Sequence, residues 1–226
     1  MLVELRTRTV LVVAAHPDDE TIGAGGLLAE MQDAVVAHVT DGSPRNPADA
    51  LAAGCRSAAD YAALRRAEML AALALAGIGS ERTRALGLCD QEVTAQATEA
   101  ARRIGALLRE VRPAVVLTHA YEGGHPDHDA AALAVHAACA LVEDPPRVAE
   151  FAGYHGLRGW MEPGDFLPGG PEAVALLLSP EARRRKQAML ERYASQRETL
   201  RIFSPAVERF RYAPHYCFTA PPHPGV

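Results

Sequence analysis

The chain lacks three features: an excess of positive charge, closely spaced cysteines, and a long apolar run. Its 226 residues carry a net charge of −5, which gives no electrostatic reason to expect nucleic acid or an anionic membrane as a partner. No apolar stretch approaches the roughly 18 residues that cross a bilayer. The N-terminal segment does not resemble a signal peptide, because its short apolar run ends in His-Pro-Asp-Asp. The four cysteines form no CxxC pair, which is typical of reduced, packed thiols. We therefore expect a cytoplasmic protein without a membrane-spanning segment.

Short apolar runs alternate with segments of helical composition along the chain. Such alternation predicts parallel strands joined by right-handed crossovers. The expected fold class is therefore α/β, with a Rossmann-like, doubly wound, mostly parallel sheet, helices on both faces and a C-terminal elaboration. Strands are predicted at 9–15, 34–40, 83–88, 114–120, 148–154 and 173–178, and helices at 22–32, 61–77, 94–110, 127–142 and 180–196.

No linker or internal repeat divides the chain, so residues 1–226 are expected to form a single domain. Its core would span about 8–155 and the elaboration about 156–226. Residues 41–57 contain prolines and glycines without helical or strand periodicity, which predicts a long loop of the kind that is often functional. The segment after the last predicted helix is expected to be irregular.

Two polar clusters follow apolar strands directly. His16, Asp18 and Asp19 follow the first strand, and the segment 118–128 follows the strand that begins at 114. In a doubly wound sheet with strand order 3-2-1-4-5, these two strands are neighbours at the topological switch point, where ligands bind. Both clusters are therefore expected to open into one crevice.

The clusters together contain a set of metal ligands. His16 and Asp19 are three residues apart, as are His125 and His128. Two imidazoles and one carboxylate with an open position are typical of a catalytic zinc site, and Fe²⁺ suits the same ligands. A bound metal activates water and polarises a carbonyl, which predicts hydrolysis.

The remaining ionisable residues of the two clusters suit proton transfer. Asp18 could act as general base toward the attacking water, and a histidine of the HxxH pair could stabilise the oxyanion and protonate the leaving nitrogen. Asp127 is placed to hold that histidine in one tautomer.

The motifs resemble those of a known family. AHPDDE at 15–20, followed by TIGAGG, and HPDH at 125–128 are similar to the zinc-dependent deacetylases of the LmbE-like and PIG-L group. That group includes N-acetylglucosaminyl-phosphatidylinositol de-N-acetylases and the deacetylases of bacterial mycothiol and bacillithiol synthesis. The similarity continues through LRRAE at 64–68, LGLCD at 86–90 and YASQ at 193–196.

The resemblance implies a role for each matching residue. It implies zinc as the cofactor, a small amino-sugar substrate, and removal of an N-acetyl group. Some members carry a tyrosine near the HPDH motif that contacts the reacting carbonyl, and Tyr121 lies four residues before His125. The implied metal ligands are His16, Asp19 and His128, the general base is Asp18, the acid or oxyanion-stabilising group is His125 with Asp127 as its orienting partner, and the substrate-binding residues are Arg65, Asp90 and Tyr121.

Other functions stay open from the sequence. The amide could belong to a thiol conjugate or an N-acyl glycopeptide, and the protein could form a homo-oligomer. Two histidines and a carboxylate also describe a non-haem iron oxygenase, although that chemistry usually occurs on a different scaffold. A non-catalytic sugar-binding protein is the last alternative, and the presence of both Asp18 and His125 argues against it.

Overall fold

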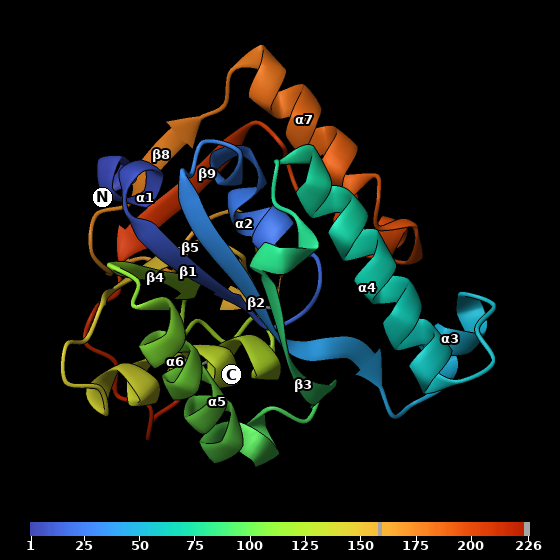
Figure 1. Cartoon of the computed structure of the whole chain (residues 1–226), viewed down its shortest axis with the longest axis horizontal. Coiled ribbons are helices and arrows are strands. Elements are labelled where there is room, and N and C mark those ends of the chain that lie inside the picture. The colour runs from blue at the N-terminus through green and yellow to red at the C-terminus, as the bar shows by residue number, and fades with distance from the viewer. Residues whose placement is uncertain (158–159, 224–226) are drawn as a thin grey trace.

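A seven-stranded sheet forms the centre of the computed structural model, which describes residues 1–157 and 160–223 (Figure 1). The strand order is β3-β2-β1-β4-β5-β9-β8. The strands of this sheet are β1 (Thr9–Ala14), β2 (Asp33–Pro44), β3 (Thr83–Asp90), β4 (Val115–His119), β5 (Arg147–Phe151), β8 (Val174–Leu177) and β9 (Val207–Tyr212). Two short strands, β6 (Tyr154–His155) and β7 (Glu162–Pro163), form a separate antiparallel hairpin.

Helices cover both faces of the sheet. The helices are α1 (Leu2–Thr7), α2 (Asp19–Leu28), α3 (Ala48–Ala52), α4 (Ala58–Leu75), α5 (Ala97–Val111), α6 (Pro126–Ala140), α7 (Pro180–Leu190) and α8 (Arg197–Leu200). Among the described residues, none of these helices combines the length and the apolar character that crossing a membrane requires.

The predicted topology is confirmed. Strands β1 to β5 pair in parallel in the order 3-2-1-4-5. The chain leaves β1 through α2 toward β2 on one side, while β4 pairs with β1 on the other side. The switch point therefore lies between the ends of β1 and β4, where both polar clusters begin.

The alternation of side chains along β1 divides the core into two layers. Val10 and Val12 are fully buried in a cluster formed with α2, α4 and α7, whereas Leu11 and Val13 are fully buried in a second cluster with α5 and α6. Figure 1 shows these two groups of helices on opposite sides of the strands. A strand buried on both faces explains the continuous apolar run of β1, because neither face contacts water.

Several predicted boundaries differ from the structure. Helix α1 was not expected, and α2 begins at Asp19 instead of residue 22. The long loop predicted at 41–57 is partly regular: β2 continues to Pro44, which pairs with Asp90 of β3, and α3 follows. The end of β2 is ordered because it pairs with β3, and the proline and glycine content of this segment does not predict that pairing.

The predicted irregular tail contains a strand of the main sheet. β9 pairs antiparallel with both β5 and β8 and lies between them. Its sequence alternates charged residues with aromatic ones, but Glu208 and Arg211 are buried instead of solvated. Glu208 pairs with Lys186, and Arg211 pairs with Glu150. The strand was not predicted because its buried side chains include charged ones, so its sequence lacks the alternation of buried apolar and exposed polar residues.

Candidate active site

The predicted metal ligands lie together at the switch point. His16 follows β1, Asp19 is the first residue of α2, and His128 lies in the first turn of α6. Asp19 lies between the two histidines: its Oδ2 is 3.2 Å from Nδ1 of His16, and its Oδ1 is 3.2 Å from Nε2 of His128. All three are buried. Burial opposes ionisation of Asp19, but His128 and His119 outweigh it and hold the pKa of this carboxyl well below its usual range.

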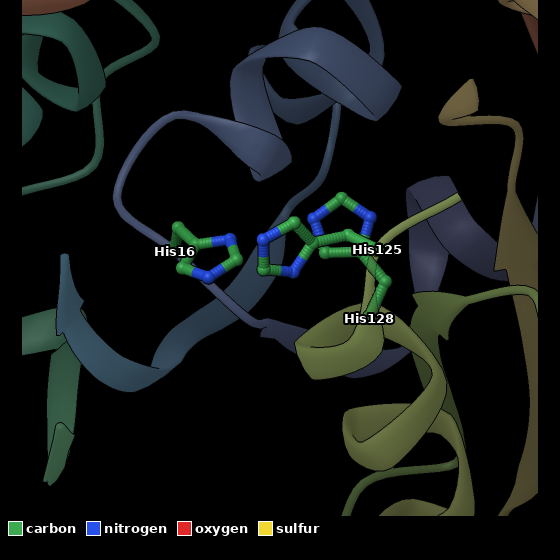
Figure 2. Close-up of side chains that lie close together, drawn as sticks. All are labelled: His16, His125 and His128. Carbon is green, nitrogen blue, oxygen red and sulfur yellow. The ribbon is translucent and has the colours of Figure 1, made fainter. Parts of the chain in front are cut away.

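His125 faces the same point as the two predicted histidine ligands. Figure 2 shows the imidazole rings of His16, His125 and His128 turned toward one another, His16 from the segment after β1 and the other two from the start of α6. The His16 and His125 rings are 4.8 Å apart in an edge-on arrangement. Burial, followed by the neighbouring His16 and His128, lowers the pKa of His125 to about 4. The ring is therefore neutral at pH 7.

The cluster suits a divalent cation. One ligand atom from each of His16, His125 and His128 lies within 4.8 Å of the others, and the same holds for Asp19, His119 and His128. Imidazole nitrogen and carboxylate oxygen are ordinary ligands of Zn²⁺, and both also bind Fe²⁺. A cation would also offset the burial of Asp18 and Asp19, the acidic residues at the start of α2.

Asp127 does not make the predicted contact with the ring of His125. His125 is the N-cap of α6, and its Nδ1 accepts a hydrogen bond from the backbone N–H of Asp127 at 3.1 Å. The Asp127 carboxylate instead accepts hydrogen bonds from the backbone N–H groups of Gln91 and Val93 and lies 3.3 Å from Nε2 of His16. Asp127 lies in the first turn of α6, and its carboxylate points away from the N-cap residue His125. The carboxylate therefore orients His16, and the backbone amide orients His125.

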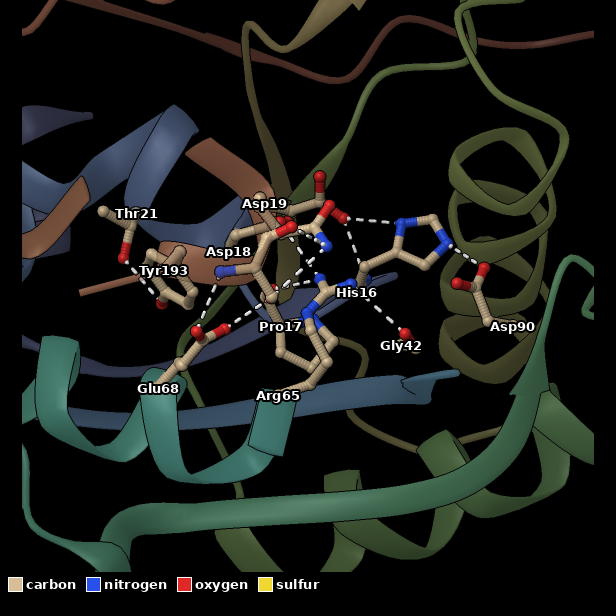
Figure 3. A network of polar contacts seen from close by, with 12 residues as sticks. His16, Pro17, Asp18, Asp19, Thr21, Gly42, Arg65, Glu68, Asp90 and Tyr193 are labelled. Carbon is tan, nitrogen blue, oxygen red and sulfur yellow. Dashed lines mark hydrogen bonds and ion pairs between the residues drawn. The ribbon is translucent and has the colours of Figure 1, made fainter. Parts of the chain in front are cut away.

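Asp18 and Arg65 form a buried pair beside Asp19. Nη2 of Arg65 donates to Oδ2 of Asp18 at 3.1 Å and to the carbonyl oxygen of Pro17 at 2.7 Å, and Nη1 donates to the carbonyl oxygen of Gly42 at 3.2 Å (Figure 3). Burial raises the pKa of Asp18 to about 8, and the Arg65 charge opposes that rise. Arg65 holds the turn that carries Asp18, so both of its terminal nitrogens are already engaged by protein atoms.

Asp90 lies on the other side of His16. Its Oδ1 is 3.0 Å from Nε2 of His16, at the end of β3. Asp90, Asp127 and His16 thus form a third compact group of ligand atoms. Two carboxylates near one imidazole, together with Asp19, raise the pKa of His16 well above its usual value despite its burial.

Tyr121 lies away from this cluster. Its hydroxyl donates to the carbonyl oxygen of Ala220 at 2.8 Å, and its ring contacts Tyr216 and Phe218. The loop between Tyr121 and α6 turns the tyrosine toward the C-terminal segment. The position does not support the implied contact with a reacting carbonyl.

The sequence did not single out Tyr154, and it left His119 unassigned. The ring of Tyr154 is 5.2 Å from that of His128, and burial raises its pKa. His119 stacks on His128 with ring centroids 4.1 Å apart, and its Nε2 accepts the backbone N–H of Ala15 at 2.9 Å. Burial lowers the pKa of His119 to about 4. Tyr154 follows an ordinary buried strand, so no sequence signal marks it. The place of His119 at the end of β4 was the one available signal.

Comparison with known proteins identifies a family whose model includes both polar clusters. The family model of the GlcNAc-PI de-N-acetylases, PIG-L, matches residues 11–139, which include both polar clusters. The 1D-myo-inositol 2-acetamido-2-deoxy-alpha-D-glucopyranoside deacetylase of Rhodococcus erythropolis is 36% identical over 144 residues, covering 54% of this chain and 49% of that protein. The chain thus spans about half the length of the curated relatives it matches.

Solved structures share the fold at low identity. The zinc-inhibited form of teicoplanin deacetylase Orf2 matches with a TM-score of 0.67 and 20% identity, covering 92% of this chain and 100% of that chain. GalB, the 4-carboxy-2-hydroxymuconate hydratase of Pseudomonas putida KT2440, matches with a TM-score of 0.69 and 20% identity, covering 93% and 98%. Because the fold occurs with two activities, it does not by itself determine the reaction. The family model matches more than half of the chain, and the chain therefore belongs to the PIG-L family of GlcNAc-PI de-N-acetylases.

Proposed function

We propose that the protein is a metal-dependent hydrolase that removes an N-acetyl group from an amino-sugar conjugate. One observation supports this most directly: the carboxylate of Asp19, from one loop, lies 3.2 Å from both His16 of its own loop and His128 of the other. The two motifs that define the family therefore meet at one point. The buried Asp18, next in the chain, supplies a candidate base beside it.

His16, Asp19 and His128 would hold the metal. Zinc is linked to the family through the zinc-inhibited relative, and the donor set fits Zn²⁺ or Fe²⁺ equally. A divalent cation bound here would lower the pKa of a water molecule and polarise the amide carbonyl.

Asp18 is the proposed general base. Arg65 binds its Oδ2, while within the described residues Oδ1 makes no hydrogen bond. That oxygen is free to accept the proton of the attacking water. A neighbouring cation would stabilise the ionised carboxylate and offset the effect of burial on its pKa.

His125 is the proposed stabiliser of the oxyanion. Its Nδ1 accepts the Asp127 N–H, so the proton of the neutral ring is on Nε2. That nitrogen can donate a hydrogen bond to the carbonyl oxygen as negative charge develops there. The leaving amine would take the proton that Asp18 accepts from the attacking water, because the Nδ1 lone pair of His125 is occupied by the Asp127 N–H.

The substrate class is an amino sugar joined to a further group. The names of the relatives support an acetamido sugar linked to inositol, and one solved neighbour is a deacetylase named for teicoplanin. Asp90, beside His16, is the candidate substrate contact. The terminal nitrogens of the buried Arg65 are instead engaged by Asp18 and by two backbone carbonyl oxygens, which suits Arg65 to position Asp18. An amidase acting on another conjugate, such as a thiol conjugate, would use the same residues.

The first test is metal content. We expect about one equivalent of zinc or iron per chain in protein purified without added metal, because the donor set is complete for a three-ligand catalytic site. His16→Ala, Asp19→Ala and His128→Ala should each lose it. His136→Ala, on the same helix but packed against Tyr216 and Phe218, is the matched control and should keep it. Wild-type protein that neither contains nor takes up metal would overturn the assignment.

The second test is activity on a panel of N-acetylated sugars, sugar phosphates and sugar conjugates, scored for released acetate and free amine. Asp18→Asn should bind metal and lower kcat on the best substrate by about 10²- to 10⁴-fold, the usual contribution of a general base. Near wild-type turnover in this variant would remove Asp18 from its role. Release of no acetate from any member would contradict the deacetylase assignment.

A further inference from the structure

The backbone of Asp18 has a conformation that non-glycine residues rarely adopt. Its φ is 137° and its ψ is −30° at the N-cap of α2. A positive φ at a residue with a side chain is strained and persists only where surrounding contacts hold it. The residue proposed as general base thus depends on its neighbours for its position.

The side chain of Glu20 binds the backbone of Asp18. Glu20 is fully buried, and its Oε2 accepts the backbone N–H of Asp18 at 3.1 Å. The same oxygen lies 2.9 Å from Nε2 of His38. The other oxygen, Oε1, accepts the hydroxyls of Tyr193 at 2.6 Å and Thr21 at 2.9 Å. Four hydrogen bonds therefore fix one carboxylate.

These partners come from distant parts of the chain. His38 lies on β2, and Tyr193 follows α7, 173 residues after Glu20. Both are buried, Tyr193 completely. In Figure 3, Thr21 and Tyr193 lie on one side of Asp18, and His16 and Asp90 lie on the other. His38 is joined to the Asp18 backbone through Glu20. Tyr193 is joined to it through Glu20 and also through Thr21, whose Oγ1 lies 3.1 Å from the Tyr193 hydroxyl.

We propose that Tyr193 and His38 are positioning residues for the hydrolysis, acting through Glu20 on the backbone of Asp18. This inference rests on the proposed function, because it takes Asp18 as the base. Loss of the Tyr193 hydroxyl leaves the Thr21 hydroxyl as the remaining donor to Oε1 of Glu20, loosens the hydrogen bond from the Asp18 N–H and lets the strained turn relax. Proton transfer is sensitive to such shifts, whereas substrate contacts on the open side of the site are not changed.

Tyr216 offers a matched control. Its hydroxyl donates to Oε1 of Glu150 at 2.6 Å, and Glu150 is fully buried like Glu20. Tyr193→Phe and Tyr216→Phe therefore remove the same kind of hydrogen bond to the same kind of partner. Only the first is joined to Asp18.

The experiment compares kcat, KM, metal content and the hydrogen exchange of the Asp18 amide, measured by NMR, in the two variants. We expect Tyr193→Phe to keep its metal, to lower kcat at least tenfold with KM within twofold of wild type, and to exchange the Asp18 amide faster. Tyr216→Phe should change neither kcat nor that exchange. Equal effects in the two variants, metal loss in Tyr193→Phe, or a kcat loss without faster exchange would each overturn the proposal.

If Tyr193→Phe does not fold, two variants of His38 test the same positioning of Asp18 through Glu20. His38→Leu removes the hydrogen bond to Glu20 and should lower kcat and speed exchange at Asp18. His38→Gln can donate the same bond from its amide nitrogen and should restore most of both. If wild type hydrolyses nothing in the panel, the proposed function fails. The exchange measurement still tests whether Glu20 holds the Asp18 backbone, and unchanged exchange in Tyr193→Phe and His38→Leu refutes the proposal.

Discussion

Glu122 is a buried glutamate with incomplete charge compensation. Its Oε1 accepts hydrogen bonds from the backbone N–H of Leu167 at 2.8 Å and from Arg211 at 3.0 Å, but Arg211 also pairs with Glu150. Burial raises the pKa of Glu122 to about 7, and Arg211 opposes the rise. The folded state therefore holds this proton more tightly than the unfolded state. The resulting stability is complete below the unfolded pKa, near 4.5, and is lost as the pH rises through about 7.

We expect the stability advantage of wild type over Glu122→Gln to shrink between pH 5 and pH 8, on the order of 2 kcal/mol in free energy of unfolding. The glutamine cannot titrate, so only wild type loses this contribution. Urea unfolding at several pH values measures the difference. Glu198→Gln, at an exposed glutamate, is the control and should give a constant difference. If the difference in free energy of unfolding between wild type and Glu122→Gln is also constant with pH, Glu122 does not cause the pH dependence.

At the scale of elements, one buried ion pair joins α7, α2 and β9. Nζ of Lys186 donates to the carbonyl oxygen of Ile22 at 2.7 Å and to Oε1 of Glu208 at 2.8 Å. Glu208 also accepts the backbone N–H groups of Gly26 and Leu27. We expect Lys186→Met to lower the free energy of unfolding by about 3–5 kcal/mol, because it leaves the Glu208 charge buried without a partner. Chemical unfolding measures this loss, and Lys186→Met with Glu208→Gln should recover part of it. A loss below about 1 kcal/mol would mean that water reaches Glu208.

At the scale of the whole molecule, the C-terminal part of the chain completes the main sheet. β9 lies between β5 and β8, and α7 packs against α2. We expect thermal unfolding to be one cooperative transition, with far-UV and near-UV circular dichroism changing together. A chain ending at residue 155 would expose the edge of β5 and the apolar face of α2, and should not fold stably. Two separate transitions, or a truncated chain that melts cooperatively near the full-length Tm, would show that the core about 8–155 folds independently.

The central strands and both polar clusters could be predicted from sequence because their signals are local. β1 is a continuous apolar run, and the His-Pro-Asp motifs directly follow β1 and the loop after β4. The strand order 3-2-1-4-5, assumed from the fold class and observed in the sheet, brings the two clusters to one point, and the resemblance indicated His16, Asp19 and His128 within them. The contacts of the Asp127 carboxylate depend on the geometry of the N-terminal turn of α6, and the orientation of Tyr121 depends on the glycine-containing loop that follows it. Residue spacing predicts neither side-chain direction.

The sequence by itself indicated the parallel α/β class and the ligand types that follow β1, because periodicity and motif spacing are properties of neighbouring residues. Only the tertiary structure decided what surrounds those ligands. It placed β9 inside the sheet by pairing Arg211 with Glu150, and it brought Tyr193 onto Glu20 across 173 residues. Such contacts depend on the packing of whole elements, because burying a charge or a hydroxyl is favourable only where a partner from another element is already in place.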